Sequence, residues 1–452
     1  MSKFIKKILN FQKRKNGNIS ILVLVMSLAI ILLTTAMVGY IFHDIGFTEL
    51  DKEKLRALHF AESGLSNMYY KIEQYGESGV ALPPVSPAYY TEPVGDPADP
   101  EGSFTVEYET YYLGEYSLIE RYDITSTGTD ISSSVARTVR VNVLTLNIYD
   151  FIFSGNILCG NTTIVGPFLV NGELDIVTGR SKFLEGPLFV KENIIVGGSS
   201  SIGEVSNSID LFMGGSMFDL NGSKIDPLNP PDSVGVYVDK FYNSVFNIYL
   251  PDIDDNYINS VIASGAKVIE GNLFIGNGII KVNEKEIVGG YDNYLKFVGG
   301  VLQIGKNTVV RGNITIGATK GTKYAVKYKG KANLISTGNI YVYSQLIPVS
   351  FINFPVDDLL GLVAKNNIYL HLNGALGGTI NNPNAAVMAI TNNMIELKNG
   401  VIIRGCTISD NLTMAQNSVI YYEKWIGNYL PAGVPEFNDI LFSLNWQEII
   451  AD

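Results

Sequence analysis

The sequence predicts a mainly β protein with three parts: a long N-terminal transmembrane and amphipathic α-helix, a small antiparallel sheet, and a right-handed parallel β-helix (solenoid). Two observations lead to this fold class. An uncharged apolar run near the N-terminus continues, without a Gly or Pro cluster, into a charged amphipathic stretch. Beyond about Asn147, short apolar segments recur behind Gly or Asn corners, as the stacked coils of a solenoid require.

We expect six consecutive segments, which differ in composition and periodicity. They are a basic leader (1–17), a transmembrane and amphipathic helix (18–75), a Pro-rich linker (76–102), an antiparallel β-meander (103–147), a β-solenoid (148–424) with insertions near 207–262 and 346–364, and a C-terminal cap or tail (425–452). Each boundary follows from a change in pattern described below.

The distribution of charge separates the first residues from the rest of the chain. Residues 1–18 hold six Lys and Arg and no Asp or Glu, although the whole chain has a net charge of −11. The 33 Lys and Arg residues less these six leave 27, against 44 Asp and Glu. Binding to nucleic acid needs clustered basic side chains, so the acidic body excludes nucleic acid as a partner.

The apolar run is long enough to cross a membrane. From Ile19 to Phe42 there are 24 residues without a formal charge, which would extend about 36 Å as a helix. A secretory signal peptide has an apolar core of roughly 7–15 residues followed by a small-residue cleavage site, and neither fits this run. The positive-inside rule places residues 1–18 in the cytoplasm and the body outside.

Helical periodicity continues beyond the apolar run. Apolar residues follow at alternating steps of three and four with charges between them, at Leu58, Ala61, Leu65, Met68 and Ile72. The simplest structure is therefore one continuous helix from about Ile19 to about Tyr75.

Two short motifs mark this N-terminal region. The basic leader ends "RKNG" at Gly17, and a small-residue motif follows within the helix, formed by Ala61, Glu62, Ser63, Gly64 and Leu65. Together with the uncharged helix, these motifs resemble the N-terminal region of type IV pilus assembly proteins of the PilX kind and of related tip pseudopilins. The resemblance implies that a prepilin peptidase cuts after Gly17, leaving Asn18 as the new N-terminus and retaining the helix.

One position departs from that resemblance. Major pilins carry a Glu five residues into the mature chain, where it pairs with the N-terminus of a neighbouring subunit, and this sequence has Leu22 instead. The resemblance implies that tip-type subunits tolerate the loss because no subunit lies above them. An uncleaved membrane anchor would also fit Leu22, so both interpretations stay open.

Between the helix and the repeats we expect a linker and a small sheet. Residues 76–102 hold six prolines without periodicity. Alternating apolar and polar residues in 103–147 then predict three antiparallel strands, with Phe104, Val106 and Tyr108 on one face.

Internal repeats dominate the rest of the chain. Four segments align without gaps on a shared glycine, at Gly166, Gly186, Gly271 and Gly312. From Asn313, equivalent asparagines follow at steps of 26, 28 and 26, at Asn339, Asn367 and Asn393. Such steps and corners indicate a parallel β-helix, whereas a β-sandwich would turn every 8–12 residues without self-similarity. No strict six-residue period of a left-handed helix is visible, and we expect the tail to cap the final coil.

Few residues could carry chemistry. Cys159 and Cys406 lie far apart in the sequence, which predicts two buried apolar side chains rather than a metal site or a disulfide. The acidic stretch 252–255 lacks the Gly turn and distal Glu of a calcium loop. His371 lies in an alternating pattern typical of a rim position. We therefore assign no catalytic residue, metal or cofactor.

These observations predict a minor pilin-like structural subunit of a type IV pilus or related filament or secretion system, without enzymatic activity. It would be a single-pass membrane protein before assembly and would present its solenoid at the cell surface, for filament initiation or adhesion. The expected partners are membrane lipid, other pilin-like subunits, the prepilin peptidase, and a surface glycan or protein ligand. Two alternatives stay open: a membrane-anchored β-helix enzyme acting on polysaccharide, and a bactofilin-like scaffold.

Overall fold

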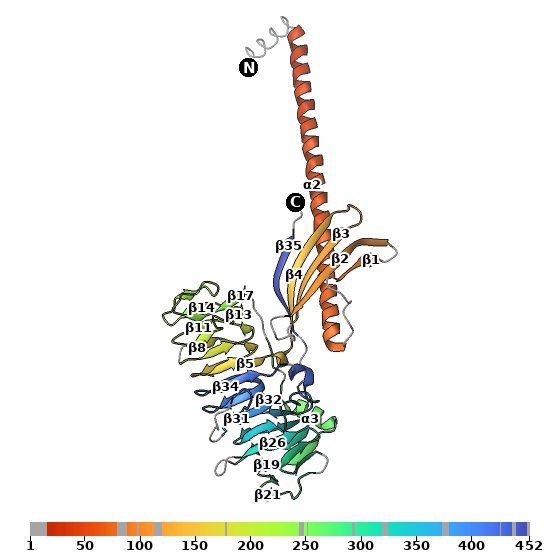
Figure 1. Cartoon of the computed structure of the whole chain (residues 1–452). Coiled ribbons are helices and arrows are strands. Elements are labelled where there is room, and N and C mark those ends of the chain that lie inside the picture. Colours follow the sequence, from red (N-terminus) through yellow and green to blue (C-terminus); the bar gives the residue numbers. More distant parts are fainter. Residues whose placement is uncertain are drawn as a thin grey trace, which may run out of the picture.

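The computed structural model contains a long helix, an antiparallel sheet and a stack of short parallel strands (Figure 1). The structure describes residues 16–78, 88–96, 99–112, 120–176, 179–243, 248–250, 252–291, 294–318, 324–372, 379–424, 426–435 and 440–449. The mainly β fold class predicted from the sequence, with its single long N-terminal apolar helix and small sheet, is confirmed in this part of the chain.

Helix α2 (Asn16–Ser78) is a single uninterrupted helix of 63 residues. No proline occurs within it, so nothing in the sequence forces a break or kink. At about 1.5 Å per residue the rod is about 95 Å long. The predicted continuity of the helix is confirmed, while leader residues 1–15 lie outside the described residues.

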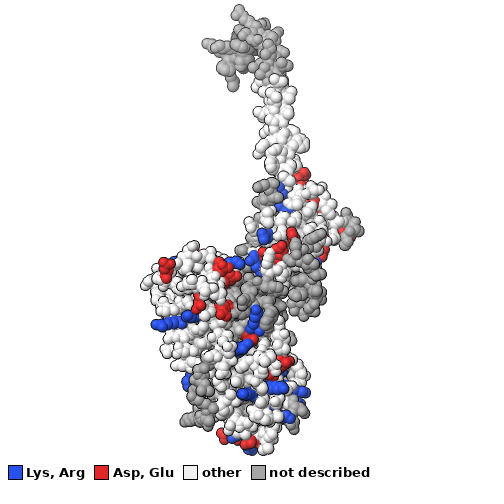
Figure 2. Space-filling model, in the orientation of Figure 1, with Lys and Arg blue, Asp and Glu red and all other residues white. Residues whose placement is uncertain are grey.

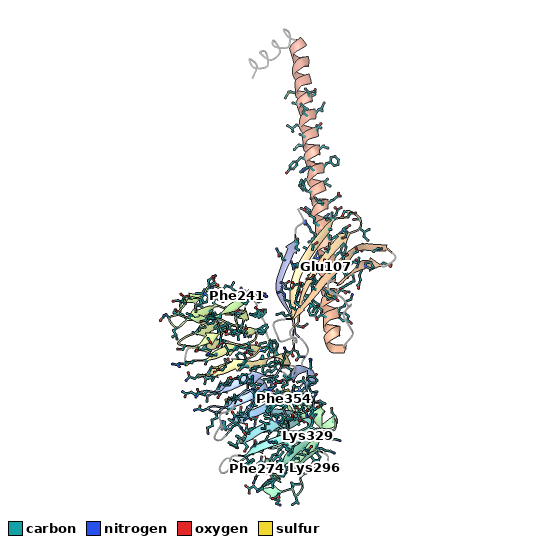
Figure 3. The ribbon with its side chains drawn as sticks, viewed as in Figure 1. Glu107, Phe241, Phe274, Lys296, Lys329 and Phe354 are labelled. Atoms are coloured by element: carbon teal, nitrogen blue, oxygen red, sulfur yellow. The ribbon has the colours of Figure 1, made fainter. Side chains whose placement is uncertain are left out.

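A five-stranded antiparallel sheet packs against the lower half of α2 (Figure 1). Its strands are β1 (Ala88–Asp96), β2 (Asp99–Tyr112), β3 (Glu120–Asp130), β4 (Ala136–Leu146) and β35 (Ile440–Ile449), in the order β1-β2-β3-β4-β35. The predicted alternation holds along β2, because Phe104, Val106 and Tyr108 are buried against the helix while Glu107 is exposed on the other face (Figure 3).

Two expectations about the borders of this sheet were wrong. Residues 76–102 are not a linker throughout, since they contain β1 and the start of β2. Pro93 fits there because β1 is an edge strand, where a missing N–H breaks no ladder. The tail 425–452 does not cap the last coil; its strand β35 pairs with β4 and completes the sheet.

The solenoid starts directly after β4 and forms its first half from residues 152–243. The elements of this half are η1 (Ile148–Asp150), β5 (Ile152–Cys159), β6 (Thr163–Val165), β7 (Phe168–Val170), β8 (Leu174–Ile176), β9 (Lys182–Leu184), β10 (Leu188–Val190), β11 (Ile194–Val196), β12 (Ser201–Ile202), β13 (Ile209–Met213), β14 (Met217–Asp219), β15 (Lys224–Ile225), β16 (Gly235–Val236) and β17 (Val238–Asn243). Parallel pairing runs β5-β7-β10-β13-β17 along one side of this stack.

The chain then returns along the side of the stack to the opposite end. The returning segment is held by asparagine side chains: the Asn171 amide donates to the Ile248 carbonyl at 2.8 Å, and Asn392 accepts from the Ile253 N–H at 2.6 Å. Helix α3 (Asp255–Ala263) follows and packs Ile258 and Val261 on the core.

The second half of the solenoid grows back from the far end toward the first. Its elements are β18 (Lys267–Glu270), β19 (Leu273–Gly276), β20 (Ile279–Val282), β21 (Lys285–Glu286), β22 (Leu295–Val298), β23 (Val301–Ile304), β24 (Thr308–Arg311), β25 (Ile314–Ile316), β26 (Ala325–Lys329), β27 (Lys331–Ser336), β28 (Ile340–Val342), β29 (Gln345–Pro348), β30 (Leu359–Ala364), β31 (Ile368–Leu370), β32 (Ala385–Leu397), β33 (Ile402–Met414), β34 (Val419–Tyr422) and η2 (Ile426–Tyr429). Parallel pairing runs β19-β25-β28-β31-β32-β33.

The two halves join in the middle of the stack, at a seam between the last and the first coils. There β33 pairs in parallel with β5, and β34 pairs with β6. The result is one continuous stack whose sequence order starts in the middle, runs to one end, and resumes from the other end (Figure 1). The last coil in the sequence, which contains β33 and β34, is therefore covered by the first coil, which contains β5 and β6. Because this coil needs no cap, the tail can pair with the sheet instead.

The repeat positions predicted from the sequence stack on one another. A Cβ on Gly186 would lie 2.5 Å from the Gly166 carbonyl carbon, and one on Gly312 would lie 2.7 Å from that of Gly271. The predicted insertions were too wide: 207–262 includes β13, β14, β16 and β17, and 346–364 includes most of β29 and all of β30. Only shorter excursions, such as 349–358, leave the stack.

The corner asparagines form a ladder. Asn339 donates its N–H to the Asn313 side chain at 2.8 Å, and Asn367 donates to that of Asn339 at 3.0 Å. At the next coil the Asn367 side chain accepts from Met394 rather than Asn393, because a bulge shifts the register of β32 there. The predicted periodicity is confirmed up to this bulge, where the prediction was off by one residue.

The seam can be tested through Cys406, whose thiol donates to the Phe151 carbonyl across it at 2.9 Å. Burial raises the pKa of the Cys406 thiol, and it raises that of Cys159 to about 12, so both stay protonated and shielded. We expect Phe153→Ala, which opens a cavity beside Ile408, to destabilise the seam by about 3–5 kcal/mol and to accelerate labelling of these cysteines by a thiol reagent.

Phe241→Ala, at the far end of the first half, is the control and should leave the labelling rate near that of the natural chain. Equal labelling of both variants would contradict the seam described here.

Candidate functional site

The upper half of α2 is an apolar surface with no cover from the rest of the described chain. Side chains from Met26 to Phe42 are exposed, with 64% of Leu33 and 69% of Phe42 accessible. Figure 2 shows no charged side chain on the described part of this half. Its threonine hydroxyls are satisfied locally, since Thr34 and Thr35 donate to carbonyls one turn earlier. By length and composition, this part of the helix could cross a membrane.

The lower half of α2 is covered by the sheet. Ala61, Leu65, Met68 and Ile72 are buried in a core of their own, separate from the solenoid core, together with residues of β2, β3 and β4. These are the positions that the steps of three and four singled out in the sequence. The helix is thus divided into a bare half, whose side chains from Met26 to Phe42 are exposed, and a clamped half, which packs on the sheet through residues from Ala61 to Ile72.

The small-residue motif lies at the closest approach between helix and sheet. Ala61, Gly64 and Leu65 face the sheet, whereas Ser63 is exposed and donates to the His59 carbonyl at 2.8 Å. A Cβ on Gly64 would lie 2.3 Å from the Ser126 hydroxyl oxygen and 2.9 Å from the Phe104 ring. The motif therefore acts here as a packing motif.

The sheet contributes glycines of its own to this contact, which we did not single out from the sequence. A Cβ on Gly128 would lie 2.1 Å from the Ala57 carbonyl oxygen and 2.3 Å from the Ala61 nitrogen. One on Gly102 would lie 2.2 Å from the Phe60 ring. An isolated glycine in an alternating strand signals such an approach of another backbone, so Gly128 in "STGTD" was a usable signal.

Polar contacts hold the flanks of the helix to the sheet. Lys71 Nζ lies 2.8 Å from Glu92 Oε1, and the Asn67 amide donates to Glu92 Oε2 at 3.1 Å. At the other end, the buried Asp130 accepts from Ser132 and Ser133 and lies 3.9 Å from the Arg56 guanidinium. The hydrogen bonds from Ser132, with the nearby Arg56 charge, lower the pKa of Asp130, so the carboxylate stays charged at pH values where an ordinary Asp is already protonated.

The predicted processing residues lie at the start of the helix. Gly17, Asn18 and Leu22 all belong to α2, and only their backbone is described. Their place in an unbroken helix is compatible with either cleavage after Gly17 or retention of the leader.

Two chain crossings connect the sheet to the solenoid, and we call them together the neck (residues 147–151 and 426–435). Tyr149 joins them, since its hydroxyl donates to the Pro435 carbonyl. The Tyr149 carbonyl also accepts from the Tyr422 hydroxyl of β34 at 3.1 Å, which attaches the neck to the solenoid. Tyr149 is 2% exposed, and this burial raises its pKa well above the ordinary value. A further contact joins the sheet to the end of the first half, where Arg121 donates to the Tyr242 hydroxyl at 3.3 Å.

The outer face of the second half carries a row of tyrosines. The rings of Tyr341 and Tyr369 stack at 5.0 Å and 6°, and their hydroxyls accept from Asn339 and Asn367 of the ladder. Because the two rings cover one face of each other across adjacent coils, this row reinforces the coils. His371 directly follows β31 and does not lie within a strand as its alternating pattern suggested; its side chain is partly exposed and lies 2.9 Å from Glu396.

The acidic stretch 252–255 has structural roles in the described chain. Asp254 caps α3 by accepting from the Tyr257 N–H at 2.9 Å, and Asp255 lies 2.7 Å from Lys365. The hydrogen bond from the Tyr257 N–H lowers the pKa of Asp254. Cys159 and Cys406 are both buried, as predicted, and neither is in a disulfide.

Comparisons with known proteins give little beyond this geometry. No family model matches the chain, and no curated protein matches it. One similar solved structure is the competence-associated pilin ComZ from Thermus thermophilus, at 15% identity and a TM-score of 0.40, over 88% of this chain and 97% of that one. A likeness of this size establishes neither a family nor a function for this chain.

The contact between helix and sheet can be tested at Gly128. A Val there has no space beside the Ala57 carbonyl, so we expect Gly128→Val to destabilise the contact by about 3 kcal/mol. Hydrogen exchange of the amides in residues 57–72 should then accelerate by about a hundredfold in the detergent-solubilised chain. Thr125→Val, on the other face of the same strand, is the control; equal acceleration in both variants would contradict the packing.

Proposed function

We propose that the chain is a minor pilin-like structural subunit of a type IV pilus or a related filament or secretion system. The observation that carries this proposal is the division of one uninterrupted helix into a bare apolar half and a half clamped to a sheet. A plain membrane tether has no need of such a rod, because a flexible linker after the membrane span would serve it equally well.

The bare half of α2 suits two successive environments. In the membrane its side chains face lipid, and its backbone hydrogen bonds are satisfied within the helix. In a filament the same side chains pack among the helices of neighbouring subunits, which exclude water equally well. The clamped half then fixes the direction in which each subunit holds its body.

We propose that the prepilin peptidase cuts after Gly17, and that Leu22 marks a subunit without a partner above it. The basic leader ending in "RKNG" and the motif of residues 61–65 support this assignment. The leader would lie in the cytoplasm and the acidic body outside, in keeping with the positive-inside rule.

The solenoid is then displayed at the cell surface, for filament initiation or adhesion. Its attachment through the two crossings of the neck supports a display role, because a body held at two points transmits its orientation to the rod. We propose that the display is non-catalytic: the described tyrosine row and acidic stretch are explained by structural contacts.

The ends of the stack argue against a bactofilin-like scaffold. At one end β19 is followed by the antiparallel hairpin strands β20 and β21, and at the other β14 pairs with the antiparallel strand β15. Such irregular additions blunt the edges through which solenoids would stack end to end.

The intact mass of the chain tests the proposal. We expect the chain extracted from membranes of cells with the prepilin peptidase to lack residues 1–17 and to start at Asn18, and the chain from cells without the enzyme to retain them. Gly17→Leu should block the mass change. Gly39→Leu should leave it intact, because an added Cβ there would meet no other part of the described chain within 4 Å. An unchanged N-terminus in both cell types would show that pilin-type processing is wrong.

A further inference from the structure

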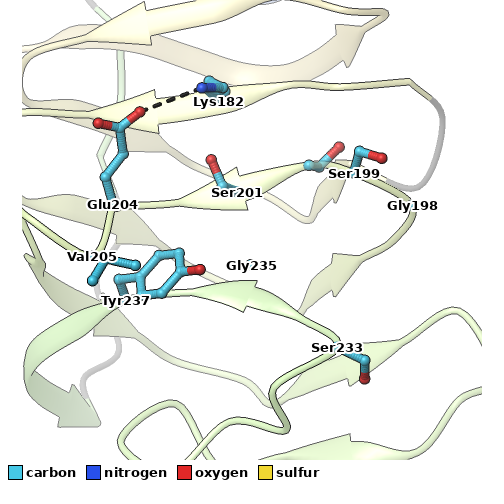
Figure 4. Close-up of a pocket in the computed structure, with 11 residues that line it drawn as sticks. Lys182, Gly198, Ser199, Ser201, Glu204, Val205, Ser233, Gly235 and Tyr237 are labelled. Carbon is cyan, nitrogen blue, oxygen red and sulfur yellow. Dashed lines mark hydrogen bonds and ion pairs between the residues drawn. The ribbon is translucent and has the colours of Figure 1, made fainter.

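A shallow groove of about 390 Å³ lies on the outer surface of the first half of the solenoid, across β9, β12 and β16 (Figure 4). The three strands pair in register there, so that Ser201 lies between Lys182 on one coil and Gly235 on the other. Serine and glycine at these two positions keep the floor of the groove low. The groove is therefore a consequence of small residues at stacked outward positions.

Charged and aromatic side chains line one end of the groove, and hydroxyls line the other. Lys182 Nζ lies 3.3 Å from Glu204 Oε1, and both side chains are nearly half exposed. Tyr237 lies beside Glu204, whereas Ser199 and Ser233 lie at the opposite end (Figure 4). The groove thus combines one aromatic ring, one ion pair and several hydroxyls.

This lining disfavours most classes of ligand. The charge of Lys182 is balanced by Glu204, so the groove offers no net attraction to an anion or a cation. An extended peptide could not insert as a strand within the groove, because β12 is already paired on both sides, with β9 and with β16. Val205 is the one aliphatic residue of the lining, which leaves too little apolar surface for a hydrophobic ligand.

The same lining matches a polyhydroxylated, uncharged ligand. Serine hydroxyls both donate and accept hydrogen bonds, Lys182 donates and Glu204 accepts, so together they match the alternating hydroxyls of a sugar ring. The Ser201 hydroxyl is buried and points toward β9, so this side chain forms part of the floor of the groove and is not counted among the groups that bind the ligand (Figure 4). Tyr237 offers an amphipathic ring against which the apolar face of a sugar can pack.

We propose that this groove binds a neutral saccharide unit of a surface glycan. Tyr237 packs against the sugar ring, Lys182 and Glu204 bind adjacent hydroxyls, and the small residues Ser201 and Gly235 leave space for the unit above the floor. The inference deepens the adhesive role proposed above and depends on it only for its biological setting, because the binding itself is a property of the isolated chain.

A glycan array carrying neutral, sialylated and sulfated glycans tests the inference with the full chain in detergent. We expect the natural chain to bind a subset of the neutral glycans. Tyr237→Ala removes the packing surface, and Ser199→Trp fills the groove from its exposed rim; each should weaken binding about tenfold or more. Ser199→Trp also guards against misfolding, because Ser199 is an exposed residue.

The matched controls are Tyr249→Ala and Ser206→Trp, which change an exposed tyrosine and an exposed serine outside the groove. Both should bind like the natural chain. The inference is wrong if no neutral glycan binds, if only acidic glycans bind, or if groove and control variants weaken binding equally. If the leader is removed as expected but no neutral glycan binds, the saccharide site is wrong and the pilin proposal stands. If a neutral glycan binds but the leader is not removed, the saccharide site stands and the pilin proposal is wrong.

Discussion

The close approach of helix α2 to its sheet is the constraint on which the rest of the structure depends. At Gly128 the two backbones come so near that even a methyl group would lie 2.1 Å from the Ala57 carbonyl oxygen. Contact between backbones fixes the helix axis relative to the strands more firmly than contact between long side chains, which can change rotamer. Because α2 is one piece, fixing its lower half also fixes the direction of its bare upper half.

The same sheet determines how the solenoid is attached. Its fifth strand, β35, comes from the end of the chain, so the whole solenoid is inserted between two neighbouring strands of one sheet. An insertion of this kind requires the chain to leave and return at one place, and the seam between β33 and β5 makes that possible. The body is consequently held by two crossings joined at Tyr149.

Local patterns in the sequence were sufficient for the helix, the alternation in β2 and the glycine and asparagine corners, because each depends on residues close in sequence. The seam, the insertion and the position of β35 could not be predicted in this way. Pairing of Phe153 with Ile408 joins residues that are far apart, and no periodicity distinguishes a stack built in order from one that starts in the middle. The sequence shows Gly128 within a predicted strand, but it does not tell a close approach of the helix from a bulge, because a glycine in a strand can mark either. The groove beside Tyr237 arises from register across three coils, which a single sequence does not reveal.

The distance between two spin labels on α2 tests most directly the claim that one rigid rod carries the body. Ser27 and Ser63 are both exposed, and replacing each with a labelled cysteine places the labels on the bare and the clamped halves. Thirty-six residues of continuous helix predict a single narrow distribution near about 54 Å in detergent. A broad distribution, or one centred at clearly shorter distances, would show that the helix breaks between membrane and body and would contradict the account.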